Sequence, residues 1–149
     1  MLSRNNPFYK YLTYEDKEHV RLVEYINKTY PHIVYFHIPN EGKKTAFERY
    51  KHSIMGALEG APDFMFLVPK VVEGHVIHHG LLIELKAPEH KRVVLKGKNA
   101  GKIVKAVGKL SESQKIVLEK VNNAKYLGIC CFGYDEAVLE LKKYMEFGK

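Results

Sequence analysis

Two apolar segments of the chain carry charged side chains at one end. Residues 62–68 (PDFMFLV) open an apolar run with Asp63, and residues 81–86 (LLIELK) close another with Glu84 and Lys86. Charged side chains are rare in apolar strands unless they are paired or bind a metal ion. Two acids and a lysine brought together there have the composition of a site that hydrolyses phosphodiesters with a divalent metal ion.

A predicted turn between these segments sets their register. Glu73 and Gly74 lie midway, and an acidic residue followed by glycine suits a two-residue hairpin loop. Pairing around this turn places Asp63 opposite Glu84, with Cβ atoms roughly 5 Å apart, and alternation puts Lys86 on the face of Glu84. Carboxylates at that distance repel, and a cation between them would resolve the repulsion. An ordinary hairpin with a turn aspartate and a surface Glu-x-Lys pair explains the same spacing.

The excess positive charge of the chain is concentrated in one segment. The chain has 24 Lys and Arg against 17 Asp and Glu, a formal net charge of +7. Residues 86–109 hold eight basic side chains and one acidic side chain, Glu89, so this segment accounts for the whole excess. Concentrated positive charge favours binding to a polyanion such as a nucleic-acid backbone. A solvated lysine-rich loop is the alternative explanation.

Length and composition limit the class of protein. The 149 residues fit one domain, 1–149, with a basic insert at about 87–109. We expect a cytoplasmic location and no membrane partner, because apolar runs are too short to span a bilayer and the N-terminus lacks a secretion signal. Cys130 and Cys131 are neighbours on opposite faces of a predicted strand, which favours two reduced thiols. The histidines at 75, 78 and 79 fit a polar loop tip better than a zinc site.

The elements that must position the charged residues follow from apolar periodicity and capping signals. We predict helices over 13–28, 45–58, 111–121 and 135–145. We predict strands over 33–38, 62–68, 81–86 and 126–132. The glycine-punctuated basic segment is compatible with a helix around 99–107 or with a mobile loop. This order predicts an α/β fold in which helices flank a mixed sheet.

Four ordered segments carry a family resemblance. They are residues 38–40 (IPN), 60–63 (GAPD), 84–86 (ELK) and 108–114 (GKLSESQ), preceded by a helix that contains glutamate. This combination resembles the VRR-NUC (virus-type replication-repair nuclease) domain of the PD-(D/E)xK nuclease superfamily. The resemblance covers roughly residues 13–130 and implies a restriction-endonuclease-like core. The long basic insert departs from many relatives, so the resemblance leaves the path of DNA open.

The resemblance also assigns roles to residues of the two strands. It implies that Asp63 and Glu84 bind Mg²⁺ or Mn²⁺, with the backbone carbonyl of Leu85 as a further ligand. Lys86 would orient or help to deprotonate the attacking water and neutralise phosphate charge. Gln114 would position Lys86 or the scissile phosphate. The S-x-x-Q sequence that contains Gln114 is also a capping box, and both roles are compatible.

Three further positions are less closely defined by the resemblance. Glu15 is the best match to the family's helix glutamate, and Glu18 is the alternative. Asn40 and Lys43 are candidates for DNA contacts, although Asn-Glu-Gly is also ordinary turn chemistry.

The function implied by the resemblance is that of a metal-dependent DNA endonuclease. Small members of this family act as homodimers on branched DNA, so we expect a homodimer that resolves Holliday-type junctions, since a two-fold axis supplies two related sites. A non-catalytic nucleic-acid-binding module on the same fold and a duplex-cutting nuclease of the restriction type are the alternatives.

Overall fold

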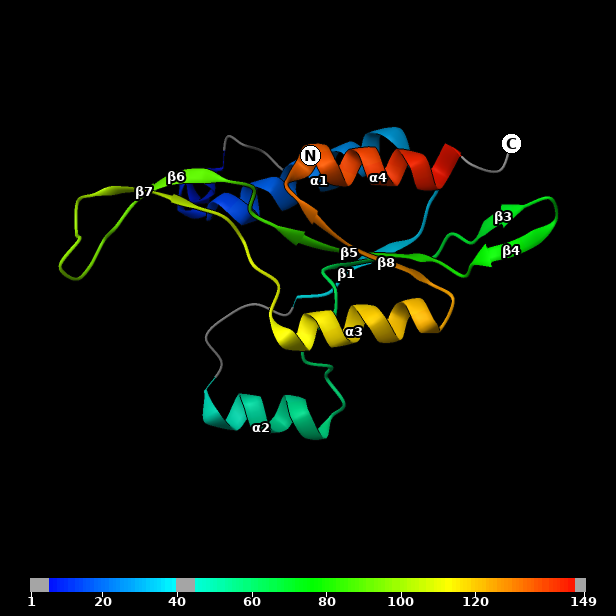
Figure 1. Ribbon diagram of the computed structural model, residues 1–149, viewed down its shortest axis with the longest axis horizontal. Helices are drawn as coiled ribbons and strands as arrows, with labels where there is room; N and C mark the ends of the chain where they lie inside the picture. Colours follow the sequence, from blue (N-terminus) through cyan, green and yellow to red (C-terminus); the bar gives the residue numbers. More distant parts are fainter. Residues whose placement is uncertain (1–5, 40–44, 147–149) are drawn as a thin grey trace.

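A four-stranded mixed sheet forms the centre of the protein, which a computed structural model describes over residues 6–39 and 45–146 (Figure 1). Asn40 and Lys43 lie outside these ranges. The strand order is β1-β2-β5-β8. The pairs β1–β2 and β2–β5 are antiparallel, whereas β5 and β8 run parallel. The strands are β1 (Tyr35–His37), β2 (Phe64–Phe66), β5 (Leu81–Lys86) and β8 (Leu127–Phe132).

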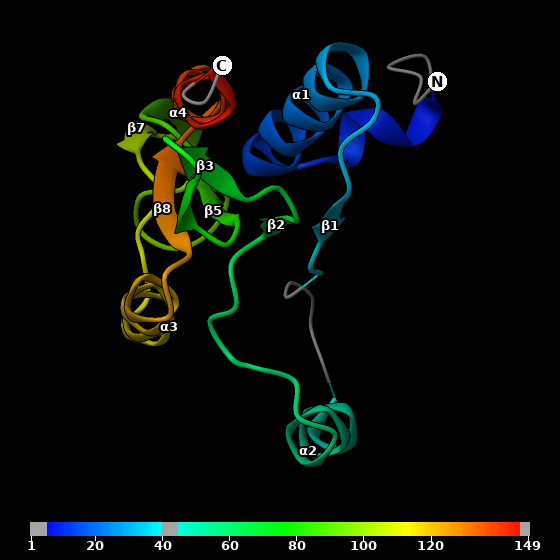
Figure 2. The same ribbon diagram turned by 90° about the vertical axis from the view of Figure 1, so that its right-hand side faces the viewer.

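Helices cover both faces of this sheet (Figures 1 and 2). Helices α1 (Tyr14–Thr29) and α4 (Tyr134–Glu146) pack together on one face, and α3 (Glu112–Asn123) packs against β8 on the other. All six residues of β5 are buried, as expected for a central strand with both faces covered. The side chains at the centre of the core are fully buried: Leu22, Ile26, Phe64, Phe66, Leu81, Ile83, Leu85 and Leu141. The predicted α/β class and mixed sheet are confirmed.

Side-chain caps fix where the main helices begin. The hydroxyl of Thr13 accepts from the backbone N–H of Asp16, and the Asp16 carboxylate accepts from the backbone N–H of Thr13, so α1 begins with a capping box. Helix α3 begins with the same arrangement between Ser111 and Gln114. A third capping box, at Thr45, opens α2 (Ala46–Ile54), which ends before the predicted residue 58.

The hairpin turn lies where the sequence predicts it. Glu73 and Gly74 both have positive φ angles, of 50° and 79°, as a two-residue hairpin turn of type I′ requires. They join β3 (Lys70–Val72) to β4 (His75–His78), a separate two-stranded sheet. The register shifts between Lys70 and Val71, and it returns to the predicted pairing between β2 and β5.

The basic insert forms a two-stranded hairpin, so the helix around 99–107, one of the two interpretations of this segment, is wrong. Strand β6 (His90–Val93) pairs antiparallel with β7 (Ile103–Ala106). The β-branched residues of β7 favour a strand, and Gly97 and Gly101, each with φ of 85°, adopt a conformation that does not continue a helix. A short 3₁₀ helix, η1 (Pro7–Tyr11), precedes α1 and was not predicted.

Two further expectations concern cysteine chemistry and membranes. Cys130 and Cys131 are free thiols in β8. In the part of the chain that the structure describes, the helices are too short or too polar to cross a bilayer.

Candidate active site

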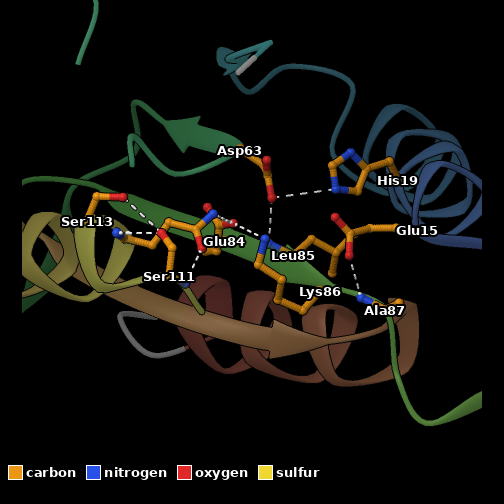
Figure 3. Close-up of polar contacts among 10 residues, drawn as sticks. Glu15, His19, Asp63, Glu84, Leu85, Lys86, Ala87, Ser111 and Ser113 are labelled. Atoms are coloured by element: carbon orange, nitrogen blue, oxygen red, sulfur yellow. Dashed lines mark hydrogen bonds and ion pairs between the residues drawn. The ribbon is translucent and has the colours of Figure 1, made fainter. Parts of the chain in front are cut away.

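The register of β2 and β5 brings Asp63 and Glu84 together. Phe64 pairs with Ile83, and continuing this register by one residue places Asp63 opposite Glu84, as the turn predicted. Both carboxylates are buried, with 5% and 1% of the residue exposed. Figure 3 shows Asp63 with its contacts to Leu85 and His19. A buried acid pair at the end of adjacent strands is not the surface Glu-x-Lys pair of an ordinary hairpin.

Glu84 has one satisfied oxygen and one unsatisfied oxygen. Its Oε1 accepts from Lys86 Nζ at 2.7 Å and from Gln114 Nε2. Its Oε2 is buried and has no hydrogen-bond partner among the described residues. Burial is the main cause that raises the pKa of Glu84 to about 7; the charges of Asp63 and Glu15 raise it further, and Lys86 opposes the shift.

Lys86 is a buried cation held by its neighbours. Burial by itself lowers the pKa of Lys86, but its hydrogen bond to Glu84 and the charges of Glu84, Glu15 and Asp63 outweigh this effect and raise the pKa above its ordinary value. The ammonium group is therefore charged at neutral pH. Its place beside Glu84 on the same strand agrees with the predicted alternation.

Asp63 joins the end of β5 to helix α1. Its Oδ2 accepts a 2.7 Å hydrogen bond from the backbone N–H of Leu85 and lies 3.5 Å from Nε2 of His19. Sequence reasoning did not assign a site role to His19. Its position four residues after Glu15, and therefore on the same face of α1, was the available signal.

Gln114 forms the predicted capping box, and its second contact is with Glu84 rather than with Lys86, the residue that the resemblance implied. Its Oε1 accepts from the backbone N–H of Ser111 and completes the cap of α3, while its Nε2 donates to Glu84. The two contacts define the orientation of the amide, since an N–H faces an oxygen acceptor at each end only in this arrangement. The side chain thus positions Glu84 directly, and it shares Oε1 of Glu84 with Lys86.

The two candidate glutamates of α1 have different surroundings. Glu15 accepts a 2.8 Å hydrogen bond from the backbone N–H of Ala87, the residue after Lys86. Glu18 instead contacts the start of α4: its Oε2 accepts from the backbone N–H of Tyr134 at 2.7 Å, and its Oε1 pairs with Arg21 at 2.8 Å. Glu15 is therefore the helix glutamate next to the site, and Glu18 caps a helix.

Replacing Glu18 by Gln should lower the free energy of unfolding by about 1–3 kcal/mol, because a buried charge-assisted contact to the N-terminus of α4 is lost. Chemical denaturation measures this difference. Glu140→Gln is the control, because Glu140 forms an exposed pair with Lys143 that contributes at most about 1 kcal/mol. Equal stability of the two variants would refute the capping role of Glu18.

Two glycines of the motifs lie where backbone segments cross closely. A Cβ on Gly60 would lie 2.6 Å from the backbone carbon of Ser113 and 2.7 Å from the nitrogen of Gln114. A Cβ on Gly108 would lie 2.7 Å from Cβ of Lys86. The segment before Asp63 can therefore approach the start of α3 only because Gly60 lacks a side chain. Gly108 can approach Lys86 for the same reason.

The site offers the type of donors that Mg²⁺ and Mn²⁺ prefer. The buried, unpartnered Oε2 of Glu84 lies next to a second buried carboxylate, and hard oxygen donors suit these ions. Within residues 6–39 and 45–146, no three His, Cys, Asp or Glu side chains form a group that could hold a metal ion. A metal here would thus have two side-chain ligands, Asp63 and Glu84, and the role of the Leu85 carbonyl remains a prediction.

The fold and the site define an α/β domain whose central strands hold two buried acids and a lysine at one end. A solved structure described as a "VRR_NUC domain protein" is similar to this chain, with a TM-score of 0.66 over 93% of each chain and 18% sequence identity. No family model and no curated protein matches the chain. The structural similarity establishes the fold, and it confirms the fold expected from the VRR-NUC resemblance.

Proposed function

We propose that the protein is a VRR-NUC-type, metal-dependent endonuclease that hydrolyses phosphodiester bonds of DNA. The observation that carries this proposal is the unpartnered, buried Oε2 of Glu84 next to Asp63, with Lys86 at 2.7 Å from the other oxygen. An unpaired carboxylate oxygen in a protein interior costs free energy, and a bound cation would compensate for that cost. A module that only binds nucleic acid has no use for such an arrangement.

Each residue of the site has a defined task in this reaction. Asp63 and Glu84 would hold Mg²⁺ or Mn²⁺, with the Leu85 carbonyl as a third donor. The bound metal ion supplies Lewis-acid activation of water and of the phosphate. Lys86, whose Nζ lies 2.7 Å from Glu84, would supply a positive charge that orients the attacking water and stabilises the phosphate. Gln114 keeps Glu84 in place.

The preferred DNA is proposed to be branched, and the protein to act on it as a homodimer. The concentrated basic charge next to the site supports a nucleic-acid substrate. A two-fold symmetric dimer would present two such sites to the two symmetric strands of a four-way junction.

Cleavage of matched substrates tests the proposal. The purified protein is incubated with Mg²⁺, Mn²⁺ or a chelator and with a four-way junction, a flap and a linear duplex of shared sequence. We expect cleavage that requires the metal ion and is fastest on the junction. Asp63→Asn should remove cleavage, whereas Asp135→Asn, at an exposed position, should keep it.

The outcomes separate the competing functions. Equal cleavage of junction and duplex would exclude selectivity for branched DNA, and discrete cut positions in the duplex would indicate a restriction-type nuclease. Salt-dependent DNA binding without cleavage in any metal would show a binding module instead.

A further inference from the structure

The basic insert forms an arm that leaves the body at the active site. We call residues 87–109 the basic ribbon. It starts directly after Lys86 and extends away from the sheet and its helices as the β6–β7 hairpin (Figure 1). Between residues 90 and 106 it contains no acidic residue and six exposed basic ones: Lys91, Arg92, Lys96, Lys98, Lys102 and Lys105.

The charges of the basic ribbon repel one another. Lys91 and Lys105 are direct cross-strand partners, and like charges in that position destabilise a hairpin. One acid compensates in part, since Glu89 lies 2.9 Å from Lys105, with both side chains exposed. A polyanion bound along the basic ribbon would remove this repulsion. The hairpin is therefore most stable when a polyanion is bound to it.

The base of the basic ribbon is attached to the site. The Tyr14 and His90 rings stack at 4.4 Å with an interplanar angle of 7°. Ala87 donates its backbone N–H to Glu15 and accepts a 2.8 Å hydrogen bond from Gly108. These contacts from both strands of the base fix the direction of the arm relative to the buried acids.

The tip of the basic ribbon is ordered by hydrogen bonds and carries an apolar side chain. Val94 donates to Lys102 at 2.9 Å, and Gly101 donates to Val94 at 2.8 Å. The following residue, Leu95, is 85% exposed, and Ile103 is 68% exposed. Phosphate contacts do not require exposed apolar side chains. Groove-binding proteins, however, place leucine and isoleucine against bases and sugars, and a two-stranded ribbon fits the width of a groove.

We propose that the basic ribbon lies in a groove of duplex DNA on one side of the cleaved phosphate, with Leu95 in contact with the groove wall. This proposal rests on the proposed function and adds to it a requirement for duplex length. Leu95 lies nine positions after Lys86, so the arm reaches at most about 30 Å at about 3.3 Å per residue. That distance corresponds to about nine base pairs, at about 3.4 Å each.

Binding to DNA with duplex arms of different length tests the proposal. Fluorescence anisotropy in a chelator, without cleavage, compares arms of about five and about fifteen base pairs, chosen to lie on either side of the reach of about nine. Lys91→Gln/Lys105→Gln should weaken binding to the long arm about tenfold and reduce the salt slope by about two. Leu95→Ser should weaken long-arm binding without a change in salt slope. Leu95→Ser should bind the short arm like wild type, because Leu95 lies beyond the end of an arm of about five base pairs.

The control removes the same charge elsewhere. Lys142→Gln/Lys143→Gln changes two exposed lysines of α4 and should leave the dependence on arm length unchanged. If wild type cuts DNA but the ribbon variants bind both arms as wild type does, the ribbon proposal fails alone. If wild type neither binds nor cuts DNA, the proposed function fails together with it. A loss in the control as large as in the charge variant would also overturn the ribbon proposal.

Discussion

Replacing Lys86 by Met should slow DNA cleavage by about 10²- to 10³-fold, the cost of removing one preorganised electrostatic contact to a transition state. Met keeps most of the length and apolar stem of lysine but cannot carry the charge. DNA binding should change little, because most of the basic charge lies beyond this residue in the basic ribbon. Single-turnover cleavage rates and anisotropy on the same junction measure the two effects separately.

Two comparisons keep this result interpretable. Lys143→Met, at an exposed position of α4, should cleave like wild type. Lys86→Met also leaves Glu84 without its cation, which lowers stability. Glu84→Gln/Lys86→Met removes both charges, so it should be more stable than Lys86→Met alone. Wild-type cleavage by Lys86→Met would contradict the proposed role.

Gly60→Ala should lower the free energy of unfolding by about 2–5 kcal/mol. The φ angle of 81° strains any residue with a Cβ by about 1–3 kcal/mol, and the new Cβ would meet the backbone of Ser113 and Gln114. Displacing the first turn of α3 would also move Gln114 away from Glu84 and reduce cleavage. Denaturant unfolding and cleavage rates measure both effects.

Gly56 provides a matched control for this substitution. It has the same φ of 81°, and a Cβ there would have nothing within 4 Å. Gly56→Ala therefore reports the backbone strain alone, and the difference between the two variants reports the close approach to α3. If both variants lose the same stability, the contact between Gly60 and α3 is unimportant.

Local signals predicted the parts of the fold that depend on neighbouring residues. The turn at Glu73 and Gly74 correctly set the pairing of β2 with β5, although a register shift lies between the turn and those strands. Capping residues located α1 and α3, because a cap involves side chains only three positions apart. The pairing of Asp63 with Glu84 followed from these local features.

Local sequence signals did not predict the contacts between segments that are distant in the chain. His19 contacts Asp63 across the fold, and its spacing from Glu15 indicated a shared face of α1 but not this partner. The β6–β7 hairpin was missed because its glycines and lysines obscure the two short β-branched stretches. The different roles of Glu15 and Glu18 depend on which segment lies against each carboxylate, Ala87 or Tyr134.

The amide of Gln114 has a consequence for how the protein folds. The same side chain closes the first turn of α3 and holds Glu84, which lies thirty positions earlier in the chain. The helix terminus and the acid therefore belong to one cooperative unit, and fraying of that turn would release the carboxylate. A ligand that fixes Glu84 would, by the same linkage, slow exchange of the amide hydrogens at the start of α3 with solvent.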